Sequence, residues 1–346
     1  MRLGALGILK KMQQQREWMA RYGHIRPCIS TDHHGQKVVA VGNRLCWSPK
    51  WKFIPDFLMD YIPAVFGADW GKEELAKAEH ERHPLAQWRV DGVRFMNAQP
   101  RQADGGFCAI PSGPLMAYMG FAFNLFAIED NGRLDSQLLA RLKNKDQFQG
   151  ARHEVFAEAT CIRAGFSIEH ENEKDGAQRH AEFTAKHLGT GLKFSIEAKS
   201  RHRAGVLGFP GAPQPHEKLS LRFGGLLNDA IAKNPPFLLV VFIDTNLPYH
   251  SAEKVLTWDA KENKPSRIMC SLLDRDRKEH GGKDLYAMLV FTNHPHHYGD
   301  KNAPDHRHHL LAIVPEAIRG VTRTALFDLY QAANLYRNIP NEFPEQ

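Results

Sequence analysis

The sequence predicts an α/β fold, and three features of its second half carry this prediction. Residues 150–164 have the apolar spacing of a helix. Residues 181–187 and 192–198 alternate apolar and polar side chains on either side of a Gly-Thr-Gly turn, as in a β-hairpin. Residues 237–243 form an uninterrupted apolar run, which is typical of a fully buried strand.

The first half is expected to form an α+β accessory domain, which we bound at residues 1–145. Five of the six tryptophans lie in this half, so the two halves differ in composition. The expected elements are a helix at 11–22, hairpin strands at 38–42 and 45–47, and helices at 53–65, 72–81, 115–128 and 134–143. The aromatic residues could stack on nucleic-acid bases, but such spacings are more often core. A role in target recognition or partner docking is the expectation.

The second domain is expected to span residues 146–346. Gly165 ends its first helix, and a Gly/Pro-rich loop at 204–215 precedes a second helix. In order, the elements are a helix at 150–164, strands at 166–171, 181–187 and 192–198, a helix at 219–233, strands at 237–243, 285–291 and 310–314, and a helix at 321–336.

Composition indicates a folded protein of the cytoplasm with no membrane span. The net charge is +6, which permits nucleic-acid binding, but the surplus is not gathered into one basic run. The five cysteines are scattered without a Cys-x-x-Cys pair, so neither a disulfide framework nor a cysteine zinc site is expected. The apolar start is too short for a signal peptide, and the segment 115–128 is too short to cross a bilayer.

The segment Phe194-Ser195-Ile196-Glu197-Ala198-Lys199-Ser200 is an apolar strand that ends in Glu-x-Lys. Alternate side chains of a strand share a face, so Glu197 and Lys199 are expected to point the same way. A carboxylate can bind a divalent cation while a neighbouring lysine steadies a water or the charge on a phosphate. A solvated surface ion pair is the plain alternative.

Around this motif, the chain resembles the PD-(D/E)XK nuclease superfamily, which has the restriction-endonuclease-like fold, over about residues 148–245. The family's first helix often carries an early glutamate and ends in Gly-aromatic, matched here by Glu154 and Gly165-Phe166. The (Asp/Glu)-x-Lys of its third strand is matched by Glu197-Ala198-Lys199. Ala181-Glu182 stands where the second strand of the family has Pro-Asp. The resemblance implies an αβββαβ core with a mixed sheet.

The resemblance also implies metal-dependent cleavage of phosphodiester bonds. Glu182 and Glu197 would hold Mg²⁺ or Mn²⁺ with a backbone carbonyl near Ala198, and Glu154 would position water or a second metal. Lys199 would orient the attacking water or stabilise charge on the phosphate. DNA is the expected substrate, with RNA as an alternative, and such folds are frequent in restriction, repair and anti-phage systems, some with protein partners.

Several alternatives accompany this interpretation. Glu154 has Glu158 one turn on, and either could simply solvate the helix. Arg201 and Arg203 follow the motif with Ser200 and His202, and we expect the two arginines to contact phosphate, although a solvated basic loop is equally consistent with the sequence.

Two rival functions stay open. The Ala-Glu departure favours an inactive nuclease-like module that binds nucleic acid or serves as a scaffold subunit of a larger complex. Seven histidines between residues 280 and 309 allow a zinc hydrolase, although no pair has His-x-x-x-His spacing. These histidines are His280, His294, His296, His297, His306, His308 and His309.

Overall fold

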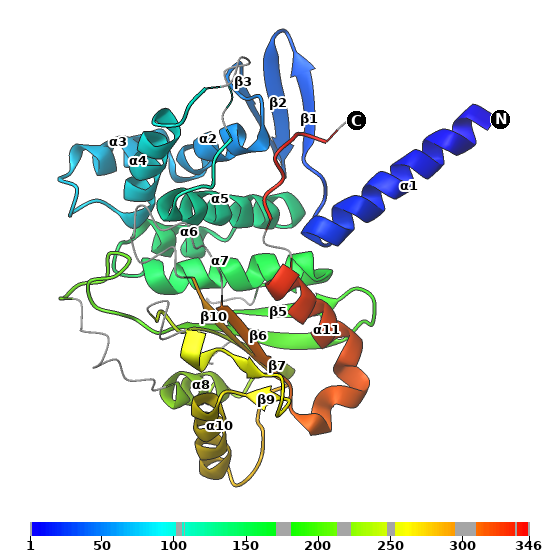
Figure 1. Cartoon of the computed structure of the whole chain (residues 1–346), viewed down its shortest axis with the longest axis vertical. Coiled ribbons are helices and arrows are strands. Elements are labelled where there is room, and N and C mark those ends of the chain that lie inside the picture. The colour runs from blue at the N-terminus through cyan, green and yellow to red at the C-terminus, as the bar shows by residue number, and fades with distance from the viewer. Residues whose placement is uncertain are drawn as a thin grey trace.

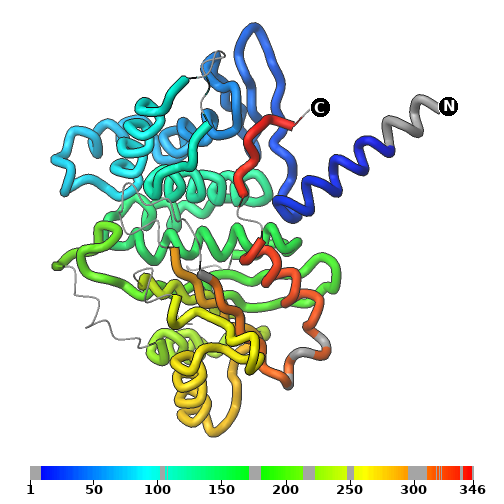
Figure 2. The backbone as a smooth tube through the Cα atoms, viewed as in Figure 1, coloured from blue at the N-terminus to red at the C-terminus, as the bar shows by residue number. Residues whose placement is uncertain are grey.

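A computed structural model describes residues 2–101, 106, 108–170, 181–212, 223–247, 253–294, 309–335 and 338–344. The described chain is a mixed α/β structure built on a six-stranded mixed sheet (Figures 1 and 2). Helices from the first half of the chain form a layer above this sheet, and helix α7 lies between them and the strands (Figure 1).

The main sheet has the strand order β11-β10-β7-β6-β5-β4. Strands β4 (Phe166–Glu169), β5 (Phe183–His187) and β6 (Lys193–Ser200) pair antiparallel, whereas β6, β7 (Leu238–Asp244) and β10 (Met288–Asn293) run parallel. Strand β11 (His309–Ile313) closes one edge antiparallel to β10. Parallel neighbours require a crossover, and α8 (Gly224–Ile231) lies in the connection from β6 to β7.

The two faces of the sheet belong to two apolar clusters, as the alternation of side chains along a strand requires. On β7, Val240 and Phe242 join a cluster with α7 (Phe148–Arg163) and α11 (Arg319–Leu335). Leu239, Val241 and Ile243 face the opposite way, toward α8 and α10 (Arg267–Glu279). The sheet is therefore covered on both sides, which explains the uninterrupted apolar run of β7.

Helix α7 is buried on nearly every side because it is shared by two cores. Phe148, Val155 and Ile162 belong to the core of the first half, while Phe156 and Cys161 pack on the sheet. Gly165, with φ of +82°, turns the chain from the helix into β4, as the sequence predicts. The polar residues of α7 are thus held among buried neighbours, where their positions are tightly fixed.

The first half contains a helical layer and a separate three-stranded sheet with the order β1-β2-β3. Helix α1 projects from the body of the molecule (Figure 1). The elements of this half are α1 (Arg2–Tyr22), β1 (Ile29–His33), β2 (Gln36–Val41), β3 (Arg44–Ser48), α2 (Ile54–Phe66), α3 (Ala68–Ala76), α4 (Pro84–Asn97), α5 (Gly113–Asn131) and α6 (Ser136–Lys143). The remaining short elements are β8 (Trp258–Asp259), β9 (Lys264–Pro265) and the 3₁₀ helix η3 (Glu316–Ile318).

The expected elements are present, with five additions and shifted ends. The sequence interpretation omitted β1, α4, α10, η3 and the β8-β9 pair, and it began the first helix nine residues late. Within the described residues, no helix combines the length and apolar character needed to cross a bilayer.

Candidate active site

Strand β6 presents Glu197 and Lys199 on the face of the sheet that α8 covers. Phe194, Ile196 and Ala198 belong to the cluster on the α7 side, so the alternate residues point the other way. Both acid and lysine lie inside the strand, because its pairing with β7 continues to Ser200 opposite Asp244. As a result the Glu197 side chain is fully buried and the Lys199 side chain is 19% exposed.

Glu182 immediately precedes β5, the strand that neighbours β6. Phe183 pairs with Ile196, and the backbone N–H of Glu182 donates to the carbonyl of that same Ile196, so both residues lie opposite the residue before Glu197. Like charges that lie close together repel each other, and burial increases this cost. The arrangement therefore requires a positive charge close by.

Two ammonium groups supply that charge. Lys199 Nζ lies 2.9 Å from Oε2 of Glu197. Lys233, just beyond the end of α8, places its Nζ 2.5 Å from Oε1 of Glu197 and 3.6 Å from Oε1 of Glu182. The Lys233 ammonium thus bridges the two carboxylates.

Glu154 approaches this cluster from α7. Both of its oxygens accept bonds from the Arg141 guanidinium of α6, each at 2.5 Å. Glu158, one turn further along α7, is buried and pairs with His170 at 3.2 Å. The alternative of solvated helix glutamates does not hold for either residue, since both side chains are buried and paired.

The three carboxylates are close enough to influence one another's ionisation. Burial, followed by the negative charge of Glu182, raises the pKa of Glu154 to about 7 despite the Arg141 pair. Burial and the charge of Glu182 also raise the pKa of Glu197, against the opposing effect of both lysines. Partial burial disfavours the charged form of Lys233, yet the carboxylates of Glu197 and Glu182 raise its pKa. Such mutual perturbation is typical of functional sites.

The donor set at this position suits a hard divalent cation, which prefers carboxylate oxygens. The bridging Lys233 ammonium shows that the space between Glu182 and Glu197 accepts a positive charge. Beyond Lys199 and Lys233, no described protein donor contacts the buried oxygens of Glu197. Across the described ranges, no group of three or more His, Cys, Asp or Glu side chains is already arranged as a metal site.

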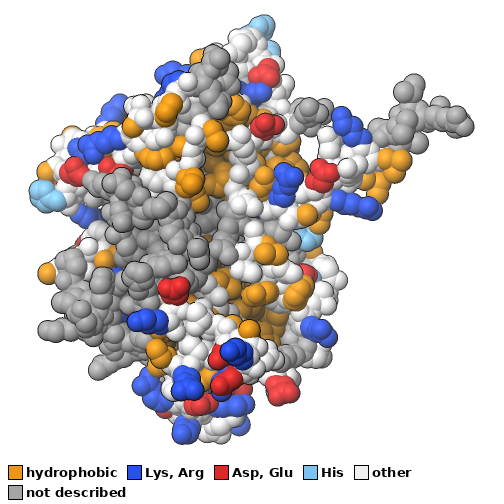
Figure 3. All heavy atoms as spheres, viewed as in Figure 1, with side chains coloured by type: hydrophobic (Ala, Val, Ile, Leu, Met, Phe, Trp, Pro, Cys, Tyr) orange, Lys and Arg blue, Asp and Glu red, His pale blue; other side chains and the backbone are white. Residues whose placement is uncertain are grey.

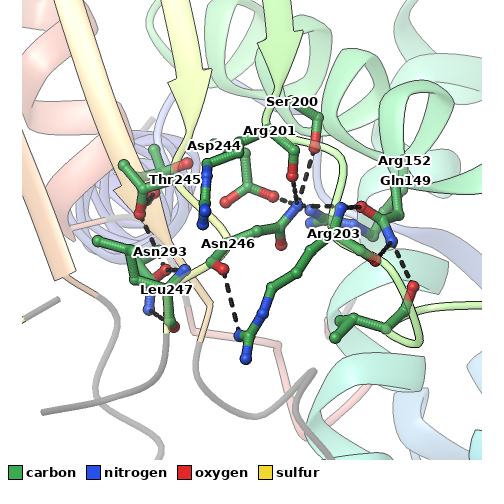
Figure 4. Close-up of polar contacts among 12 residues, drawn as sticks. Gln149, Arg152, Ser200, Arg201, Arg203, Asp244, Thr245, Asn246, Leu247 and Asn293 are labelled. Atoms are coloured by element: carbon green, nitrogen blue, oxygen red, sulfur yellow. Dashed lines mark hydrogen bonds and ion pairs between the residues drawn. The ribbon is translucent and has the colours of Figure 1, made fainter. Parts of the chain in front are cut away.

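A buried polar network lies beside the acidic cluster, where β6 and β7 end (Figure 4). The Asn246 side-chain amide donates to Ser200 Oγ at 3.0 Å and to the Arg201 carbonyl at 2.9 Å. The buried Arg152 guanidinium of α7 pairs with the carboxylate of Asp244, which is fully buried. Gln149 accepts from the Arg203 N–H and donates to the Arg203 carbonyl, both at 3.1 Å. These bonds tie the segment after β6 to the start of α7.

The network changes the expectation for the two arginines that follow β6. Arg203 is 7% exposed, and its guanidinium donates to the Asn246 carbonyl at 3.4 Å, so it lies in the interior instead of on a surface loop. Arg201 is half-buried at the same corner, and its N–H donates to the Asp244 carbonyl. Of the pair, Arg201 is the one with the more exposed position.

The histidine-rich segment contributes little to the described structure. His280 contacts the Asp276 carbonyl at 2.9 Å, and the ring of the buried His294 meets the edge of Phe156. His296, His297, His306 and His308 lie outside the described residues, and nothing is described of the His309 side chain. The zinc alternative therefore depends mainly on histidines that lie outside the described part of the chain.

Charged side chains on the visible face are dispersed. Figure 3 shows Lys and Arg side chains in small groups, several of them beside acidic side chains. This pattern agrees with the sequence, which gathers its net charge of +6 into no single basic run.

Sequence reasoning missed two of the residues that contact the acids. Lys233 is 36 positions from Glu197 and ends a predicted helix, and Arg141 belongs to a helix assigned to the accessory domain. A basic residue at the end of the helix that covers the acidic face of the sheet is a signal for Lys233. No local pattern indicates Arg141, because only the packing of α6 on α7 brings it to Glu154.

Comparisons with known proteins add no relative to this description. No protein-family model, no curated protein and no solved structure matches the chain.

Proposed function

We propose that the protein is a metal-dependent nuclease that hydrolyses phosphodiester bonds, with DNA as the substrate we expect. The observation that carries the proposal is the pair of neighbouring acids, Glu182 and Glu197, which share the Lys233 ammonium, with Lys199 on Glu197. A fold gains no stability from buried like charges, so a site that retains them suggests a functional demand.

The order of elements supports the finer fold assignment that accompanies this proposal. A helix, three antiparallel strands, a second helix and a parallel strand match the αβββαβ core of the PD-(D/E)XK superfamily. Glu154, Glu182, Glu197 and Lys199 then occupy the positions that the resemblance assigns to its site. The settings of restriction, repair and anti-phage defence, with protein partners, come from this resemblance alone.

The roles of the side chains follow from their contacts. Glu182 and Glu197 would hold Mg²⁺ or Mn²⁺, which when bound acts as a Lewis acid on the phosphate and activates the attacking water. Lys199, anchored by Glu197, would orient that water or stabilise the charge that develops on the phosphate. Glu154, held by both oxygens on Arg141, has a fixed direction from which to position water.

One observation favours the second candidate, an inactive nuclease-like module that binds nucleic acid or serves as a scaffold. The Lys233 ammonium already contacts both acids, as it would in a site that had lost its metal. The substitution of Glu182 for the aspartate usual in the family points the same way.

A cleavage assay decides between the two candidates. The full chain is incubated with supercoiled, linear and single-stranded DNA, and with RNA, in Mg²⁺, Mn²⁺ or EDTA. Cleavage that requires the metal and is lost in Glu197→Gln supports the nuclease. Binding without cleavage of any substrate by the wild-type chain supports the inactive module.

A further inference from the structure

We propose that Lys233 is an internal counter-cation that occupies the position between Glu182 and Glu197 and competes with a divalent metal for it. The inference rests on the proposed function, because it concerns how the same site is loaded. It assigns to Lys233 a role in metal affinity, separate from the role of Lys199 toward the substrate.

The contacts distinguish the two lysines. Lys233 Nζ reaches a carboxylate oxygen of each acid, at 2.5 Å on Glu197 and 3.6 Å on Glu182. Among the described ion pairs, Lys199 Nζ contacts Glu197 but not Glu182, and it does so on the other oxygen of Glu197, at 2.9 Å. A cation bound by both acids must use the space that the Lys233 ammonium now fills, whereas Lys199 approaches from outside that space.

The charge balance of the cluster points to competition. When all three are ionised, the carboxylates of Glu154, Glu182 and Glu197 are matched by three cations, Arg141, Lys199 and Lys233. A divalent ion added to this neutral set would leave an excess of two positive charges in a partly desolvated site. Withdrawal of one ammonium halves that excess, and the negative charge of a phosphodiester offsets the remainder.

Lys233 is placed so that it can withdraw. It follows the C-terminal end of α8, and Asn234 next to it takes a left-handed turn with φ of +48°. Its side chain is 20% exposed, and a flexible four-carbon stem lets an ammonium group move into solvent without backbone change. Arg141, by contrast, is fixed by two parallel bonds to Glu154.

The test is Mn²⁺ affinity, measured by titration calorimetry without nucleic acid. Lys233→Met removes the competing charge, and Lys233→Gln removes it while keeping a polar tip. Both variants should bind Mn²⁺ at least about tenfold more tightly than wild type, since close charge pairs in a cluster couple by such factors. Lys233→Arg retains the charge and should keep the wild-type affinity. Lys186→Met, at an exposed position of β5, is the matched control and should also leave the affinity unchanged.

Thermal unfolding provides a second readout that does not depend on activity. A ligand that binds the native state alone raises the melting temperature by an amount that grows with the ratio of its concentration to its Kd, so the same Mn²⁺ concentration should stabilise Lys233→Met more than wild type. Equal or weaker Mn²⁺ binding by both neutral variants overturns the inference while leaving the nuclease proposal intact. Failure of both to fold, even with Mn²⁺, overturns it in favour of a structural role. If wild type and both neutral variants all lack Mn²⁺ binding, the metal site itself is wrong.

Discussion

The buried pair between Arg152 and Asp244 tests how the candidate site is supported. The Arg152 side chain is 4% exposed and the Asp244 side chain is fully buried, in the polar layer where β6 and β7 end (Figure 4). Asp244→Asn preserves the shape of the side chain and removes its charge. The Arg152 guanidinium is then left buried without a counter-ion, which should lower the free energy of unfolding by about 3–5 kcal/mol.

Urea unfolding followed by far-UV circular dichroism measures this loss. The matched control is Glu169→Gln, the same acid-to-amide change in an exposed pair with Lys193 on the same sheet. That pair is largely solvated, so the control should lose less than about 1 kcal/mol. A double variant, Arg152→Met with Asp244→Leu, should lose less than the sum of the single variants, because a buried ion pair can be replaced by apolar groups. The reasoning is refuted if Asp244→Asn costs no more than Glu169→Gln.

The remaining predictions concern the chemistry of the site. Lys199→Ala should slow single-turnover cleavage at least about 100-fold, because the loss of one group that stabilises charge in the transition state has an effect of that size. A near-normal cleavage rate would show that Lys199 has no part in the mechanism. Glu182→Ala should lose Mn²⁺ affinity and cleavage together while Glu182→Asp keeps part of both, and unchanged calorimetric binding in Glu182→Ala would exclude it as a ligand. Protons compete with metal for carboxylates, and the pKa of Glu154 is raised to about 7. Mn²⁺ affinity should therefore increase from pH 6 to pH 8, and a flat profile would contradict a role of Glu154 near the metal. DNA affinity, followed by fluorescence anisotropy, should fall steeply between about 50 and 200 mM salt, and Arg201→Ala should reduce that slope; salt-independent binding would point to a protein partner instead.

Features of the site that depend on local sequence could be predicted, whereas features that depend on contacts between distant residues could not. The alternation of β6 correctly places Glu197 and Lys199 on one face, because that pattern is local. The strand was expected to end at residue 198, but its pairing with β7 continues to Ser200, and the Glu197 side chain is fully buried. Substitution of Glu197 therefore carries a cost in folding that an exposed strand end would not impose, and cleavage data on Glu197→Gln need a stability measurement beside them.

The elements that the sequence interpretation missed differ in whether the local sequence indicates them. Strand β1 has the sequence Ile-Ser-Thr-Asp-His, which lacks an apolar alternation, and it exists because it pairs with β2. Helices α4 and α10 did carry start signals, since His83 precedes Pro84 at a first helical position and the Ser266 hydroxyl caps Met269. Those two helices were predictable, whereas β1 was not.

The contacts of α7 and Glu154 show how the first half of the chain, bounded at residue 145 in the sequence analysis, joins the second half. Helix α7 contributes Phe148 and Val155 to the core of the first half and Phe156 to the core of the sheet. The chain also returns near its end, where Phe343 packs on the first core. Arg141 of the first half reaches into the acidic cluster to hold Glu154. The boundary between the two halves therefore follows a shared helix rather than a linker, and the first half helps to fix the geometry of the candidate site.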